Sequence, residues 1–311
     1  MPPPAWLIDG LFEVGSLVML AGPPASYKSF LALDWTLCMA VGRKWHNRKT
    51  LPAKVLYILG EGKSSLLKRI QTWTHYYDVS RAELDSLREH FRVTFDVPQM
   101  ASKASVDNML AGLEAEGFRP DVIVVDTFAR SFVGLDENSQ KDTGLWVESA
   151  DRLRQNGFTV IFLHHTAKNT EFGVKYRGST AIMGAMDTAF TMMRDPQNQS
   201  RTSLVCSKQK DHDEGDPIYL NRLIVSPDPA GEGSIVLVPA IRVDERFTPE
   251  FREKEAQIES EMLTLLNDPT FESDRARARK LASIFEITEA AAQTKISRKK
   301  KGFDGKNILQ N

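Results

Sequence analysis

The sequence predicts an α/β fold with a central, mostly parallel, twisted sheet flanked by helices. Short apolar runs at residues 17–21, 54–60, 121–127 and 158–163 have the length of buried strands. Amphipathic segments with helical spacing separate several of these runs. Strands that alternate with helices form parallel sheets, because each crossover returns the chain to the same edge before the next strand starts.

The composition excludes several classes of protein. The chain has 311 residues, of which 41% are apolar, so it can form one large core with a small appendage. Its formal net charge of -1 means that any basic surface must be local. Cys38 and Cys206 lie in apolar contexts and are expected to be buried thiols. Without an apolar run of membrane-spanning length or a secretory signal, we expect a cytoplasmic protein with no membrane partner, located in the host cytoplasm if it is viral.

Residues 22–29 lie between a predicted strand and a predicted helix and follow the pattern of a phosphate-binding loop, G-x-x-x-x-G-K-[ST], at all but one position. In this motif, backbone N–H groups bind phosphate, the lysine reaches the β- and γ-phosphates, and the hydroxyl holds Mg²⁺. We therefore expect ATP and Mg²⁺ to bind here. Tyr27 stands where the motif has its second glycine, so a degenerate nucleotide scaffold or an ordinary strand–turn–helix junction is the alternative. The expected nucleotide-binding residues are Gly22, Pro23, Pro24, Ala25, Ser26, Tyr27, Lys28, Ser29 and Phe30.

Polar residues end the other predicted strands. Glu61 follows the run at 54–60, Asp126 closes the run at 121–127, and His164 and His165 follow the run at 158–163. Ligands of α/β sheets bind at the carboxyl ends of strands. In nucleotide hydrolases an acidic strand end orients Mg²⁺, so Asp126 and Ser29 are the predicted metal-binding residues. A helix-capping Glu61 and histidines that only close a strand are the structural alternatives.

The remaining chain divides into three parts. Residues 1–16 are expected to dock on the core or on a neighbouring subunit, and the apolar segments between 181 and 241 are interpreted mostly as strands. Near residue 248 the sequence becomes charged with helical spacing, so we predict an ATPase core over 1–248 and a helix-turn-helix-like module over 249–311. Its basic residues suit a nucleic acid or a protein partner, and a solvated helical tail is the alternative. They are Arg275, Arg277, Arg279, Lys280, Lys295 and Arg298 to Lys301.

In chain order, these motifs resemble the RecA-like ATPase core of hexameric replicative helicases, and most closely the plasmid and phage RepA-like helicases of the AAA_25 group. The resemblance covers roughly residues 6–240. It is carried by the phosphate-binding loop with Lys28 and Ser29, Glu61, Asp126-Thr127, His164-His165, Arg177-Gly178-Ser179 and Lys208-Gln209-Lys210.

The resemblance implies a role for each matching position. Glu61 matches the general base that polarises the attacking water, Asp126 acts on Mg²⁺ through water, and His165 senses the γ-phosphate. The loops at 131–142 and 168–180 match those that line a central channel for single-stranded DNA. Lys168, Lys175 and Arg177 would contact the DNA phosphates, and Phe132, Phe172 and Tyr176 are the loop aromatics that could stack on bases.

Related helicases also supply a Lys-x-Arg pair to the nucleotide of the neighbouring subunit. Lys208 and Lys210 match it here, with Lys in place of Arg. Lysine supplies charge but not the planar fork of arginine. Either Lys210 or Arg177 therefore takes the trans-acting role.

The function that the resemblance implies is an ATP-dependent replicative DNA helicase of phage or plasmid type. It would be a homo-oligomeric ring, expected to be a hexamer, that moves on single-stranded DNA by hydrolysing ATP at subunit interfaces. A separate primase or polymerase is a candidate partner. The alternative is a RecA-like DNA-dependent ATPase that acts in recombination or partner loading without unwinding.

Overall fold

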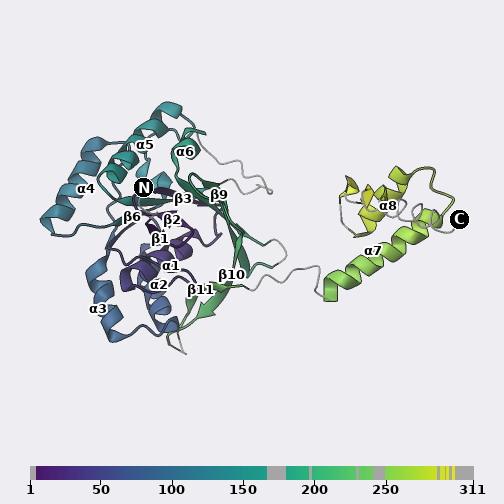
Figure 1. Cartoon of the computed structure of the whole chain (residues 1–311), viewed down its shortest axis with the longest axis horizontal. Helices are drawn as coiled ribbons and strands as arrows, with labels where there is room; N and C mark the ends of the chain where they lie inside the picture. The colour runs from purple at the N-terminus through teal and green to yellow at the C-terminus, as the bar shows by residue number, and fades with distance from the viewer. Residues whose placement is uncertain are drawn as a thin grey trace. The chain divides into compact units, whose positions relative to one another are not determined.

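The computed structural model describes residues 5–166, 180–195, 198–228, 231–240 and 249–285, with short stretches at 288–290, 292–293 and 296–297. The chain divides into two compact units, Met1–Ala240 and Ile241–Asn311. Figure 1 shows the elements of each unit. The larger unit carries the phosphate-binding loop and the polar strand ends, so its sheet is described first.

Within the described residues the larger unit is built on a sheet of nine strands in the order β11-β10-β9-β8-β3-β7-β6-β4-β5. Every pairing from β8 through β3, β7, β6 and β4 to β5 is parallel, and β9, β10 and β11 extend the sheet as antiparallel strands. The predicted α/β fold with a mostly parallel sheet is confirmed. The strands are β3 (Leu17–Gly22), β4 (Val55–Leu59), β5 (Phe91–Thr94), β6 (Val122–Asp126), β7 (Thr159–His165), β8 (Thr188–Arg194), β9 (Arg201–Gln209), β10 (Ile218–Val225) and β11 (Ser234–Pro239).

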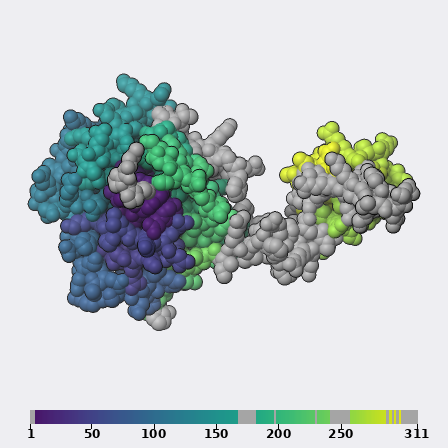
Figure 2. Space-filling view, in the orientation of Figure 1, coloured from purple at the N-terminus to yellow at the C-terminus, as the bar shows by residue number. Residues whose placement is uncertain are grey.

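Helices cover both faces of this sheet. The helices α1 (Lys28–Val41), α2 (Lys63–Tyr76) and α3 (Arg81–His90) pack on one face, and α4 (Lys103–Ala115), α5 (Gln140–Gln155) and α6 (Thr180–Ala185) pack on the other. In the space-filling view, the blue atoms of α2 and α3 and the teal atoms of α4 and α5 lie on opposite sides of this unit (Figure 2). Strands buried on both faces are apolar throughout, which explains the continuous apolar sequences of β3, β4 and β6.

The N-terminal segment docks on the chain's own core. It forms a hairpin of β1 (Trp6–Ile8) and β2 (Phe12–Glu13), and Ile8 and Phe12 are fully buried. The two cysteines are free thiols, although only Cys38 is fully buried and Cys206 is partly exposed.

Two elements differ from the sequence expectation. The segment at 181–194, interpreted as a strand, begins with the short helix α6 before β8 starts at Thr188. The helix α3 was not predicted, although Ser80 and Glu83 form the reciprocal capping box that marks a helix start. None of the residues of α3 is fully buried, and most of them are polar, so no apolar run marks this helix in the sequence.

The second unit has a small core of its own. The helices α7 (Pro249–Asn267) and α8 (Asp274–Phe285) pack together, and helical turns contribute Ala292 and Ile296. Arg277 joins the two helices, because its Nε donates to the carbonyl of Leu265 at 2.8 Å. The basic residues Lys295 and Arg298 to Lys301 lie outside the described residues. Among the described helices, none is long and apolar enough to span a membrane.

Candidate nucleotide-binding site

Four parallel strands bring the predicted site residues to one edge of the sheet. β3 ends at Gly22, beside His165 at the end of β7. β4 ends at Leu59, which pairs with Asp126 at the end of β6, and Glu61 follows two residues after Leu59. Side chains that are far apart in the sequence therefore share the edge where α/β proteins bind ligands.

The phosphate-binding loop is closely packed around Gly22. A Cβ added to Gly22 would lie 2.4 Å from the carbonyl oxygen of Met192 and 2.7 Å from Ser26 Oγ, so no side chain fits there. Lys28 folds back into the loop, and its Nζ donates to the carbonyls of Gly22 at 2.8 Å and Pro23 at 2.9 Å. Burial lowers the pKa of Lys28 to about 8, although Asp126 and Glu61 oppose the shift. The ammonium is thus positioned at the start of α1, where the helix dipole also favours an anion.

The backbone of this loop explains why the motif has glycine before the lysine. Tyr27 adopts a left-handed conformation with φ 71° and ψ 18°, and Ala25 has φ 63°. A residue with a Cβ loses about 1–2 kcal/mol in this conformation, whereas glycine does not. Tyr27 therefore takes the backbone conformation that glycine would take, at a conformational cost.

Asp126 is buried beneath the loop. The hydroxyl of Tyr57 donates to Asp126 Oδ2 at 2.9 Å, and the Ser29 side chain also makes a hydrogen bond with the carboxyl group. Burial raises the pKa of Asp126, and these two hydrogen bonds oppose the rise. The peptide bond between Asp126 and Thr127 is cis.

The residues at this edge fit a magnesium-bound phosphate. Ser29 and Asp126 are adjacent oxygen donors, and oxygen is the ligand that Mg²⁺ prefers. Thr127 Oγ1, His165 Nδ1 and Thr166 Oγ1 are buried without a hydrogen-bond partner among the described residues. Buried polar atoms of this kind are normally satisfied, so the edge has hydrogen-bonding capacity for a polar ligand.

Glu61 lies at the open side of the site. Its carboxylate is about half exposed and accepts from Arg130 Nε at 3.1 Å. Arg130 comes from the short 3-10 helix η1 (Phe128–Ser131) that follows β6. A Cβ at Gly60 would lie 2.8 Å from the Arg130 side chain, so this position beside Glu61 favours glycine.

Two cations at this edge were not identified as site residues from the sequence. Arg130 is one of them, and Arg69 of α2 is the other. The Arg69 guanidinium lies 4.5 Å from the ring centroid of Phe30, and its charge opposes the rise that burial causes in the pKa of Asp126. Both arginines reach the site through contacts distant in sequence, so no local pattern could have found them.

The two histidines at the end of β7 have different environments. His164 is buried, and burial, with smaller effects of His165 and Lys28, lowers its pKa to about 4. His165 is partly exposed, and burial and the charge of Lys28 lower its pKa, while Glu61 opposes the shift. Both imidazoles are therefore neutral at pH 7. Only His165 combines proximity to Lys28 and Glu61 with partial exposure.

Lys208 and Lys210 are not brought to this edge. β9 runs antiparallel to β8, and Gln209 pairs with Thr188 at the start of β8, so β9 ends at the opposite edge of the sheet. Lys208 Nζ donates to the carbonyls of Met183 at 2.7 Å and Gly184 at 2.9 Å. Burial lowers the pKa of Lys208.

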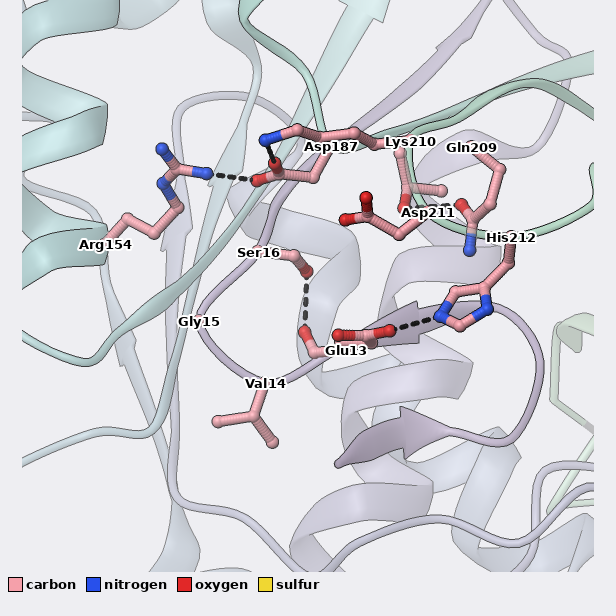
Figure 3. Close-up of a pocket in the computed structure, with 11 residues that line it drawn as sticks. Glu13, Val14, Gly15, Ser16, Arg154, Asp187, Gln209, Lys210, Asp211 and His212 are labelled. Carbon is pink, nitrogen blue, oxygen red and sulfur yellow. Dashed lines mark hydrogen bonds and ion pairs between the residues drawn. The ribbon is translucent and has the colours of Figure 1, made fainter. Parts of the chain in front are cut away.

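Lys210 lines a cavity of about 140 Å³ at that opposite edge (Figure 3). Its Nζ lies 3.5 Å from Asp187 Oδ1, and Arg154 Nη1 lies 2.5 Å from Asp187 Oδ2. On the other side of the cavity, His212 Nε2 is 2.5 Å from Glu13 Oε1. Asp187 thus holds the Lys210 ammonium at the rim, and the lysine is still more than half exposed.

The predicted DNA-contacting residues Lys168, Lys175 and Arg177 lie outside the described residues, as do Phe172 and Tyr176. The other predicted loop, 131–142, is shorter than expected because α5 begins at Gln140. The expectation that Phe132 could stack on bases is wrong. Phe132 is buried and stacks on Phe128, with 4.9 Å between ring centroids.

Comparison with known proteins gives one family match. The sequence model of the AAA_25 family, described as an AAA domain, matches residues 1–171. This range is more than half of the 311-residue chain. It includes the phosphate-binding loop, Glu61, Asp126 and His165. No curated protein sequence matches the chain at a significant level.

Several solved structures are similar to the chain. A KaiC-like protein from the hyperthermophilic archaeon Pyrococcus horikoshii OT3 has 14% identity and a TM-score of 0.47, over 75% of this chain and 94% of that one. The RadB recombinase has 15% identity and a TM-score of 0.47, over 67% and 87%. A third structure, an ATPase domain, has 14% identity and a TM-score of 0.48, over 66% and 81%. At such identities and TM-scores, none of these likenesses identifies a function.

Proposed function

This chain belongs to the AAA_25 family of AAA domains and has a RecA-like P-loop ATPase fold, and from that premise we propose that it is an ATP-dependent replicative DNA helicase of phage or plasmid type. One observation carries the ATPase part of the proposal. Side chains at or beyond the ends of four different strands lie together at one edge of the sheet, although these strands are far apart in the sequence. They are Lys28 and Ser29, Glu61, Asp126 and His165.

In the proposed site, each side chain has a separate task. Lys28 binds the β- and γ-phosphates, and with a pKa of about 8 it is mostly protonated at pH 7. Ser29 and Asp126 would hold Mg²⁺, which would supply charge stabilisation for the phosphoryl group. Glu61 is the general base that accepts a proton from the attacking water. Its ion pair with Arg130 and its partial exposure place the carboxylate at the open side of the site, within reach of water.

His165 is proposed to sense the γ-phosphate. It lies beside Gly22, and the charges of both Lys28 and Glu61 act on its pKa. As a neutral imidazole with an unpartnered buried Nδ1 among the described residues, it can donate or accept a hydrogen bond at this position. The segment that follows it in the chain contains the proposed DNA-contacting residues Lys168, Lys175 and Arg177.

The position of Lys208 and Lys210 excludes a role at the nucleotide of their own subunit. Both lie at the sheet edge opposite the phosphate-binding loop of their own subunit, so they cannot contact its nucleotide. A role in hydrolysis requires a neighbouring copy whose nucleotide faces this edge. A trans-acting cation of this kind typically contributes about 10³–10⁵ in rate. We propose a ring, expected to be a hexamer, in which Lys210 or Arg177 supplies this cation.

Non-specific contacts with DNA phosphates would hold the single strand in the ring, and binding should weaken steeply with salt. The helix-turn-helix-like module over 249–311 is proposed to bind nucleic acid or a replication partner, for which a separate primase or polymerase is the candidate. The alternative function, a RecA-like DNA-dependent ATPase in recombination or partner loading, shares the ATP site but does not unwind DNA.

Strand displacement distinguishes these functions. The assay uses a labelled duplex with one single-stranded tail, ATP and Mg²⁺, and compares the wild type with Glu61→Gln. Glu114→Gln is the matched control, because Glu114 is exposed near the end of α4, which precedes the start of β6, whereas the site lies where β6 ends. The proposal predicts tail-dependent displacement by the wild type and the control, and none by Glu61→Gln. ATP hydrolysis without displacement would contradict the helicase function and favour the alternative.

A further inference from the structure

The side chain of Tyr27 has contacts that nucleotide binding alone does not explain. This residue holds the left-handed conformation that favours glycine, at the position directly before Lys28. Glycine would remove the strain. A tyrosine in this conformation persists only when surrounding contacts hold it there.

The Tyr27 side chain is buried and makes contacts at both its ring and its hydroxyl. The Arg194 guanidinium lies over the ring, 5.1 Å from its centroid. Arg222 Nη1 donates to the hydroxyl at 3.3 Å, and the hydroxyl donates to the carbonyl of Gln199 at 3.5 Å. The ring edge of Phe30 completes the enclosure, with 6.3 Å between centroids. The phenol is thus held as donor, acceptor and cation-binding ring.

The polar partners of Tyr27 lie in or beside strands β8, β9 and β10. Arg194 ends β8, Gln199 precedes β9, and Arg222 lies in β10. Arg194 is two residues beyond Met192, and Arg222 is two residues beyond Leu220, and both of these apolar residues pack in the same core as α1. Alternate residues of a strand share a face. The two arginines therefore project on the face where the phosphate-binding loop and α1 lie.

The two arginines bring positive charge to the loop. Arg194 Nη2 also donates to the carbonyl of Gln199 at 3.1 Å, so both arginines and the Tyr27 hydroxyl belong to one group of contacts. In the part of the chain that the structure describes, the Nε of each arginine is buried without a hydrogen-bond partner. Two guanidinium groups beside the loop favour an anion in it. Their contacts with Tyr27 connect that positive region to the loop backbone.

We propose that Tyr27 is a positioning residue for nucleotide binding, whose side chain ties the left-handed turn of the phosphate-binding loop to strands β8 and β10. The inference rests on the proposed nucleotide site. The contacts of the Tyr27 side chain restrict a backbone turn that glycine would leave free. The Lys28 ammonium and the N–H groups at the start of α1 are therefore held in place before the phosphate binds. Preorganisation of this kind raises affinity because less ordering is needed on binding.

The test measures equilibrium binding of a fluorescent ATP analogue with Mg²⁺ to the full chain, together with thermal unfolding of each variant without nucleotide. Tyr27→Phe removes only the hydroxyl, and we expect binding about fivefold weaker, because the two long hydrogen bonds with Arg222 and Gln199 are lost together. Arg222→Met should weaken binding to a similar extent. The double variant should be no weaker than the weaker single variant, because both remove the same contact.

Tyr27→Gly separates the proposal from its simplest rival. If Tyr27 is only a tolerated replacement for glycine, then glycine relieves the backbone strain and binding becomes equal or tighter. A positioning role for Tyr27 predicts the opposite, an affinity for the nucleotide about tenfold lower, because both the ring and hydroxyl contacts disappear. Equal or tighter binding by Tyr27→Gly would overturn the proposal.

Two control variants address side effects. Tyr76→Phe makes the same chemical change on the surface of α2. Arg201→Met removes the same charge from β9. Because Arg194 pairs with Thr202, the neighbouring Arg201 lies on the opposite face of the sheet from Arg194. Both should bind like the wild type. Lower melting temperatures for the Tyr27 variants with unchanged affinity would mean a purely structural role and would also overturn the proposal. Failure of the wild type itself to bind would instead refute the proposed nucleotide site.

Discussion

The protonation of Lys28 makes nucleotide binding depend on pH in a defined window. Burial lowers the pKa of this lysine from 10.5 to about 8. Its ammonium is therefore present on about 90% of molecules at pH 7 and on about 10% at pH 9. If only the protonated lysine binds phosphate, the apparent affinity for ATP should fall about tenfold between these pH values. The loss begins near pH 8, because the charged form disappears as the pH rises through the pKa of the free protein.

The assay is a titration with the fluorescent ATP analogue at constant Mg²⁺ and ionic strength from about pH 7 to pH 9.5. The second pKa of a phosphate is about 6, so the charge of the ligand changes little over this range. Lys28→Arg is the matched variant, because arginine stays protonated throughout. Whatever its absolute affinity, its pH profile should be flat. A wild-type affinity that stays constant over the whole range would refute the assignment of a buried, titrating Lys28 to the phosphate.

Three further predictions concern the packing around the site. Tyr57→Phe should lower the affinity for Mg²⁺ in the presence of ATP by about 10-fold, because Asp126 loses a hydrogen bond to its charged form, and an unchanged Mg²⁺ titration would contradict this. Asp34 is buried, and burial raises its pKa from 3.8 to about 6. Its contribution to the free energy of unfolding is therefore complete below pH 3.8 and falls by roughly 3 kcal/mol as the pH rises to about 6. Urea unfolding should show this loss in the wild type but not in Asp34→Asn, and an identical pH dependence in both would exclude Asp34 as the cause. Gly22→Ala should abolish nucleotide binding, because its Cβ has no space. Gly112→Ala on α4 has free space for its Cβ and should raise the free energy of unfolding by about 0.5–1 kcal/mol in the same urea experiment.

The parts of the fold that could be predicted are those with a local signal. Buried parallel strands have continuous apolar sequences, and the phosphate-binding loop is a continuous motif between a strand and a helix. The unusual position of Tyr27 was visible for the same reason, since a glycine is expected there. The structure adds its left-handed backbone, with φ 71°.

The parts that could not be predicted depend on contacts between distant residues. The ion pair of Glu61 with Arg130 and the hydrogen bond from Tyr57 to Asp126 each join residues 69 positions apart. Phe132 was expected at a loop surface, but it is buried by stacking on Phe128. No local pattern distinguishes a loop aromatic that packs inward from one that faces solvent.

We propose that this chain is a DNA-dependent motor that hydrolyses ATP with Glu61 as the base. The most direct test is the rate of ATP hydrolysis with and without single-stranded DNA, for the wild type and for Glu61→Gln, with nucleotide binding measured in parallel. We predict strong stimulation of the wild type by DNA, and loss of hydrolysis in Glu61→Gln while ATP still binds. Absence of hydrolysis by the wild type under both conditions would contradict the motor function, and hydrolysis that survives in Glu61→Gln would contradict the role of Glu61.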